Sequence, residues 1–115
     1  MGENTWHVET YETQSGEKLV DEFIKKQRPQ AKAKITHTIK LLKLYGNKLG
    51  LPHSKALGSG LYELRIRGRE ELRITYCFGK QRTIYLLHCF KKQKQQMPPK
   101  ELDIALKRMK SLTFI

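Results

Sequence analysis

The sequence has no long apolar run, few cysteines and, after its first quarter, few acidic residues. No apolar stretch approaches the roughly 18 residues that a membrane span requires. The opening segment, MGENTWHVE, lacks the apolar core of a signal peptide, and Trp6 breaks the myristoylation pattern. These absences predict a protein with no membrane association and a cytoplasmic location.

The two cysteines, Cys77 and Cys89, both fall in strand-like segments. Thiols in that setting are more often buried apolar residues than a disulfide or a ligand pair. The sequence also has no CxxC motif and no His/Cys cluster. We therefore expect no metal site, and no cofactor is implied.

The charge is strongly basic and unevenly distributed. The net charge is +12, and residues 1–24 hold six of the 11 acidic residues but only one of the 23 basic residues. A basic segment of this kind predicts a polyanionic partner, of which nucleic acid is the usual one. The alternative is a lysine-rich surface that only keeps the protein in solution.

The length fits one domain, residues 1–115. Residues 82–90 are apolar at nearly every position, which predicts a central strand buried on both faces. The full pattern predicts a strand at 4–12, a helix at 16–27 capped by Ser15, a helix at 29–45 ended by Gly46, a long loop at 46–60, strands at 61–67, 71–78 and 82–90, and a last helix after Pro99. This β-α-α-β-β-β-α order indicates an α+β fold, with a small antiparallel-rich sheet, an N-terminal helical hairpin and a C-terminal helix.

Arginines gather on one face of two neighbouring predicted strands. Arg65 and Arg67 share a face with Glu63, and Arg73 of the next strand points to the same side. Like charges opposite each other destabilise a sheet, whereas guanidinium groups bind phosphate oxygens in a fork. The pattern favours a phosphate site. The alternative is a solvated face whose charges are dispersed by Glu63, Glu70 and Glu71.

Other residues that can carry chemistry lie at strand ends and in the long loop. The run at 90–96, FKKQKQQ, brings Lys91, Lys92 and Lys94 to the end of the last strand, where they either converge on a cleft or form a solvated charge run. His53, expected to be exposed, and His88, typical of a hydrogen-bonded core histidine, are the acid/base candidates. His7 and His37 belong to no evident constellation.

The run PHSKALGSGLYELRIR, then ELRITYCF, then IYLLHCFKKQKQQMPPKELDIALKRM, resembles the HigB-type, phage Gp49-like branch of the RelE/ParE toxin superfamily. The resemblance extends from about Thr5 to Met109 and implies the β-α-α-β-β-β-α fold. It also implies the toxin of a type II toxin–antitoxin system. Such a toxin is a ribosome-dependent, metal-independent endoribonuclease, in which a ribose 2′-OH of messenger RNA attacks the adjacent phosphate.

By position, the resemblance implies catalytic roles for Arg65, Arg73, Lys91 and Lys92. Contacts with RNA or the ribosome would then come from Lys55, Arg67, Arg69 and Lys94. The implied partners are the ribosome, messenger RNA and a cognate antitoxin that is HigA-like and DNA-binding.

Two departures leave the general base open. Glu63 stands where RelE has a catalytic lysine, and no Tyr or His follows Lys92 where several relatives carry an acid/base group, which leaves Lys91 or Lys92 as candidates. The alternative functions are a ParE-like inhibitor of DNA gyrase and an inactive phage-derived binding protein.

Overall fold

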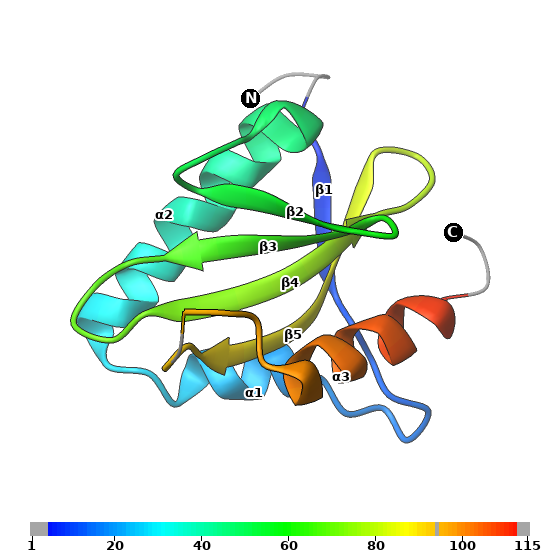
Figure 1. The fold of residues 1–115 in the computed structure, drawn as a ribbon. Helices are drawn as coiled ribbons and strands as arrows, with labels where there is room; N and C mark the ends of the chain where they lie inside the picture. The colour runs from blue at the N-terminus through cyan, green and yellow to red at the C-terminus, as the bar shows by residue number, and fades with distance from the viewer. Residues whose placement is uncertain (1–4, 94, 113–115) are drawn as a thin grey trace.

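The computed structural model describes residues 5–93 and 95–112. Within these residues the protein is α+β, with three α-helices and one five-stranded mixed sheet (Figure 1). The elements in chain order are β1 (His7–Thr10), α1 (Leu19–Lys25), α2 (Pro29–Tyr45), a 3-10 turn (Gly46–Lys48), β2 (Ser54–Gly58), β3 (Leu61–Ile66), β4 (Leu72–Phe78), β5 (Thr83–Lys91) and α3 (Pro99–Lys110).

The strands lie in the order β1-β5-β4-β3-β2. β1 pairs with β5 in parallel, and the other neighbours pair antiparallel. β5 lies between β1 and β4, and most of its side chains are buried, which confirms the central position that its apolar run predicted. The two short connections at 67–71 and 79–82 form hairpins, as their lengths predicted.

Helices cover both faces of the sheet (Figure 1). The larger core lies between the sheet and the α1–α2 hairpin, where Ile35 and Leu42 pack with Leu64, Ile74 and other strand residues. On the opposite face α3 packs through Ala105 against Leu61, Cys77 and Leu87. The helix α3 covers only part of this face (Figure 1).

The structure corrects the predicted order by one strand. The predicted loop at 46–60 contains β2, which pairs antiparallel with β3 at the edge of the sheet. The strand sequence, SKALG, has no β-branched or aromatic residue, so its propensity for a strand is weak. Pairing with β3 supplies the stabilisation that the local sequence lacks.

The first helix is shorter than predicted, and Ser15 does not cap it. The helix begins at Leu19, after Lys18, without a side-chain cap. The Ser15 hydroxyl instead donates a hydrogen bond to Glu17 at 3.2 Å, in a turn where Gly16 has a φ of 87°. Gly46 does end α2, as predicted, with a φ of 51°. Among the described residues no helix is long and apolar enough to cross a membrane.

Candidate functional site

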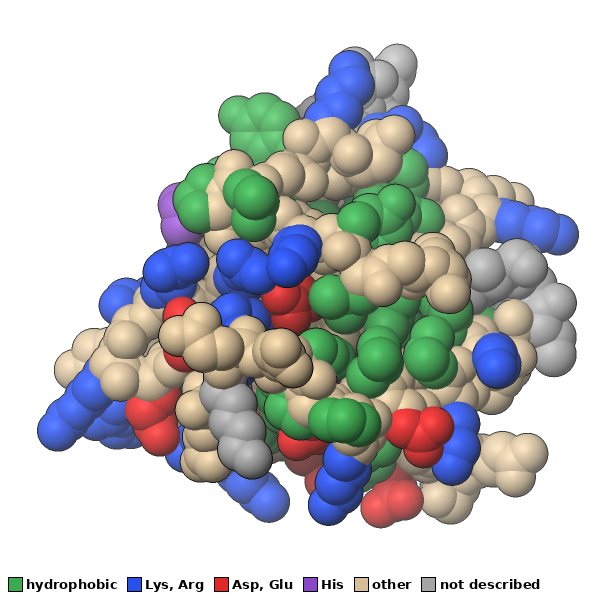
Figure 2. Space-filling model, in the orientation of Figure 1, with side chains coloured by type: hydrophobic (Ala, Val, Ile, Leu, Met, Phe, Trp, Pro, Cys, Tyr) green, Lys and Arg blue, Asp and Glu red, His purple; other side chains and the backbone are tan. Residues whose placement is uncertain are grey.

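The face that carries α3 divides into an apolar part and a charged part. Figure 2 shows hydrophobic side chains on the right of this face and Lys and Arg side chains around an acidic one on the left. In the charged part Arg65 pairs in register with Arg73, and Lys55 pairs with Glu63. Because paired residues point to the same side of a sheet, the prediction that Arg65 and Arg73 share a face is confirmed. Arg67, predicted on the same face, lies beyond the end of β3 in the β3–β4 turn.

A buried carboxylate stands between the two arginines. Glu63 accepts hydrogen bonds from Nη2 and Nε of Arg65 at 3.1 and 3.2 Å. Arg73 Nε lies 3.5 Å from the other oxygen of Glu63, and Arg73 Nη1 lies 2.8 Å from Glu71. We call these four residues the arginine network. Its two positive and two negative charges cancel, which explains how the sheet tolerates two arginines in register.

Burial separates the roles that the two arginines can play. The side chain of Arg73 is 3% exposed and that of Arg65 is 16% exposed. Arg73 Nε and Nη1 and one oxygen of Glu63 are buried without an aligned hydrogen-bond partner. Arg73 is therefore shielded from solvent, and Arg65 is the member of the pair that reaches the surface.

Arg65 also lines a pocket at the edge of the sheet, beside the start of β2. This pocket, of about 400 Å³, lies between α2 and the strands and brings together His53, His37, Arg65 and Arg67. We call it the His53 pocket. Two histidines and two arginines line this pocket, and these residue types can carry protons and bind anions. The guanidinium group of Arg65 is itself held by Glu63 on the α3 face.

The backbone fixes His53 at the mouth of this pocket. The carbonyl oxygen of His53 accepts a hydrogen bond from the Arg65 N–H at 2.7 Å, and the His53 N–H donates to Gly50 at 3.0 Å. The next residue, Ser54, is hydrogen-bonded through its hydroxyl to the hydroxyl of Tyr76 in the core. His53 is half-buried, rather than exposed as predicted, because the loop folds back onto the end of β3.

His88 lies on the α3 face of β5, which β4 separates from β3, and it has a structural partner. Its Nε2 is 2.6 Å from Glu101 of α3, and its ring stacks on Phe90. Burial lowers the pKa of His88, although the hydrogen bond to Glu101 opposes this effect. A neutral His88 therefore donates from Nε2 to the carboxylate, as expected of a hydrogen-bonded core histidine.

Lys91 and Lys92, at the end of β5, do not converge on one site. Lys91 pairs in register with Leu72, whose neighbour Arg73 pairs with Phe90, so Lys91 lies on the face opposite the arginine network. There it forms an ion pair with Glu70 at 3.0 Å. The Lys92 ammonium group donates a hydrogen bond to the carbonyl oxygen of Gln95. Lys94 lies outside the described residues.

The remaining predicted contact residues are exposed around these features. Lys55 lies beside the arginine network, whereas Arg67 and Arg69 belong to the β3–β4 turn. Among the described residues, no group of three His, Cys, Asp or Glu could hold a metal ion. Both cysteines are free and buried, as predicted, and burial raises the pKa of Cys77 to about 11 and that of Cys89 to about 12.

Sequence reasoning did not place His37 and Lys34 at a site. Both lie on α2 and line the His53 pocket. Their spacing of three residues puts them on the same side of a helix, which is a signal in the sequence. What faces that side depends on how α2 packs, and this packing is a tertiary property.

A comparison with family models identifies the chain. Residues 22–110 match the model of the phage-derived Gp49-like protein family (DUF891). The protein belongs to this family. The Gp49-like family is a RelE-like toxin family, and the match includes both the arginine network and the His53 pocket. No curated protein matches the chain.

Proposed function

We propose that this Gp49-like protein is the HigB-type toxin of a type II toxin–antitoxin pair and a ribosome-dependent endoribonuclease. The observation that carries the proposal is the His53 pocket, in which an acid/base group and a surface-reaching arginine line one cavity. The family match supports a toxin, and the net charge of +12 supports a polyanionic substrate.

Cleavage by 2′-OH attack needs a base, an acid and stabilisation of the phosphorane. In the proposed reaction, neutral His53 takes the proton of the 2′-OH while the O2′–P bond forms and the P–O5′ bond breaks. The departing 5′-oxygen receives a proton from the second histidine of the pocket, His37, which enters this step as the imidazolium. The products are a 2′,3′-cyclic phosphate and a 5′-hydroxyl. Arg65 stabilises the charge that develops on the phosphate.

We propose roles for several of these residues that differ from those expected from the sequence. Arg73 becomes a positioning residue, because its buried guanidinium holds Glu63, which in turn orients Arg65. Lys91 pairs with Glu70 on the other face and has no part in the proposed proton transfers. Lys55 and Lys92 act as surface cations that contact RNA or the ribosome, together with Arg67, Arg69 and Lys94.

The ribosome and an antitoxin complete the proposal. On the face of the arginine network, His88 stacks on Phe90, but Phe90 is only 4% exposed and offers little surface on which to order a flexible strand. The ribosome would therefore position the message. Such positioning is worth up to about 7–11 kcal/mol. A HigA-like antitoxin would hold the toxin inactive until release, with the basic α1–α2 hairpin as its docking surface.

The decisive experiment expresses the protein in translating cells and maps the ends of messenger RNA. We expect cleavage within translated messages. His53→Gln and Arg65→Gln should each reduce cleavage, by about 10²-fold or more. His7→Gln is the matched control, because His7 is exposed and lies on β1 at the far edge of the sheet.

A supercoiling assay with DNA gyrase, run in parallel, tests the alternative toxin activity. Inhibition of gyrase without new RNA ends would replace the endoribonuclease proposal with the ParE-like one. A folded His53→Gln protein that cleaves as fast as the parent would remove His53 from the mechanism.

A further inference from the structure

A second basic pocket adjoins the His53 pocket. It has a volume of about 230 Å³ and lies between the start of α2 and the β3–β4 turn. One wall carries Gln27, Arg28 and Lys34, and the other carries Arg67 and Arg69, over a floor that includes Leu72. We call it the Arg28–Arg69 pocket. Lys34 and Arg67 line both pockets, so the two pockets adjoin and share these side chains.

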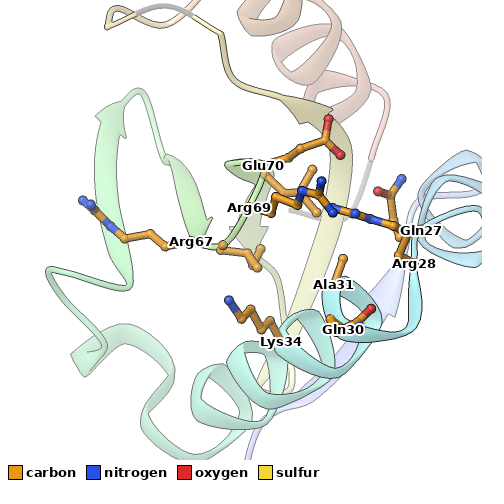
Figure 3. A pocket seen from close by; sticks show the side chains of 11 residues that line it. Gln27, Arg28, Gln30, Ala31, Lys34, Arg67, Arg69 and Glu70 are labelled. Carbon is orange, nitrogen blue, oxygen red and sulfur yellow. The ribbon is translucent and has the colours of Figure 1, made fainter.

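The positive charge of this pocket is not compensated within the described residues. Arg28, Lys34, Arg67 and Arg69 form no ion pair in that part of the chain. The acidic residue of the lining, Glu70, is already paired with Lys91 at 3.0 Å. Figure 3 shows the guanidinium groups of Arg28 and Arg69 pointing toward each other from opposite walls. Two cations held in this way repel each other, and an anion between them removes the repulsion.

The start of α2 adds to the same field. The helix is 17 residues long, its N-cap position is Arg28, and no side chain caps its first turn. That turn contains no acidic residue, and Pro29 at the first position has no N–H to donate. The N-terminal end of a helix carries a partial positive charge that favours an anion. It therefore reinforces Arg28 and Arg69, which face each other across the pocket, whereas the guanidinium group of Arg67 points away from them (Figure 3).

We propose that the Arg28–Arg69 pocket binds a backbone phosphate of the RNA strand whose neighbouring nucleotide occupies the His53 pocket. The inference rests on the proposed function, because it takes RNA as the polyanion. A phosphodiester suits the site because forked guanidinium groups match its oxygens, and because a strand supplies the next phosphate along the shared rim. An acidic protein segment is the competing occupant.

The test measures binding without cleavage. The probe is a fluorescent single-stranded DNA oligonucleotide, which lacks the attacking 2′-OH, and anisotropy gives its affinity across a salt series. Arg28→Gln combined with Arg69→Gln should lower affinity about tenfold at low salt, since hydrogen bonds between charged groups are lost. Loss of one phosphate contact should also reduce the slope of log affinity against log salt by about 0.7.

The matched control combines Lys32→Gln with Lys40→Gln. It removes the same charge from exposed positions on α2 that line neither pocket. We expect a loss of about twofold or less, because distant exposed charges are screened. Equal losses in the two double variants would overturn the inference. Arg69→Gln alone, at an exposed turn position, answers the same question if the double variant folds poorly.

Two further readouts keep this inference separate from the proposed function. A polyglutamate peptide serves as the second probe. If the Arg28→Gln/Arg69→Gln variant binds DNA as tightly as the parent but no longer binds the peptide, the RNA assignment is overturned in favour of an acidic protein segment. The DNA-binding result also decides the inference when the parent cleaves no RNA. In that case the proposed function fails, and the loss or retention of DNA affinity in the Arg28→Gln/Arg69→Gln variant still decides whether the pocket binds phosphate.

Discussion

Replacing Glu63 with glutamine tests whether the ion pairs of the arginine network contribute to stability as buried ion pairs do. The Glu63 carboxylate is 4% exposed and faces Arg65 at 3.1 Å and Arg73 at 3.5 Å. Removing its charge leaves Arg73, which is 3% exposed, with Glu71 as its remaining ion-pair partner. We therefore expect a large loss of stability.

The size of the loss follows from the geometry. Breaking a buried ion pair from one side costs about 3–5 kcal/mol. Glutamine retains one oxygen that can still accept from Arg65, so we expect the lower end, about 3 kcal/mol. For a domain of 115 residues, that loss lowers the midpoint of thermal unfolding by roughly 10 °C. Urea unfolding, followed by the fluorescence of the single tryptophan, measures it.

Two companion variants make the result interpretable. Asp103→Asn breaks an exposed pair with Lys107, whose side chains are 61% and 77% exposed, and should cost at most about 0.5 kcal/mol. Glu63→Leu combined with Arg73→Met removes both buried charges and should recover most of the lost stability. If Glu63→Gln costs no more than Asp103→Asn, the network is effectively solvated and the reasoning fails.

Three further predictions concern titration, thiol access and backbone strain. Burial lowers the pKa of His88 below 6.5, so the unfolded chain binds the proton more readily. The resulting stabilisation is present above pH 6.5 and is lost as the pH falls through that value. Between pH 7.5 and 5.0 the free energy of unfolding should therefore fall more for the parent than for His88→Gln. Equal falls for the two proteins would contradict this. The two buried thiols should react with a disulfide reagent at pH 8 only after urea is added, whereas fast labelling of the folded protein would place them at the surface. Gly46→Ala should lower the free energy of unfolding by about 2–4 kcal/mol, because φ at Gly46 is 51° and the new Cβ would lie 1.9 Å from the Trp6 indole. Gly50→Ala is the control and should be nearly neutral, because a Cβ at Gly50 would have no neighbouring atom within 4 Å. Equal stabilities of the two variants would refute the clash.

Much of the fold follows from periodicity alone. The alternation in 61–67 and 71–78 and the apolar run in 82–90 correspond to β3, β4 and β5 to within a residue or so. Pro29 and Gly46 delimit α2 through backbone rules that act locally. β2 could not be predicted in this way, because its stabilisation comes from pairing with β3 and not from its own residues.

The site was predictable only in part, for a related reason. Alternation places Arg65 and Arg73 on one face, but it carries no information about how deeply each guanidinium is buried. That Lys91 lies on the face opposite the arginine network does follow from strand alternation, once the register of β5 with β4 is known. The His53 pocket needs the packing of α2 on the end of β3, so His37 joined the site only in three dimensions.

The arginine network changes what the charge of this protein can mean for recognition. Because Glu63 and Glu71 neutralise Arg65 and Arg73 within the fold, the centre of the charged face contributes little net field. Four cations with no ion pair among the described residues, Arg28, Lys34, Arg67 and Arg69, lie instead at its margin, in the Arg28–Arg69 pocket and where it adjoins the His53 pocket. A polyanion is therefore attracted to the edge of the sheet rather than to its middle. Binding should depend more steeply on Arg28 and Arg69 than on Arg73, whose replacement should act through stability and through the orientation of Arg65.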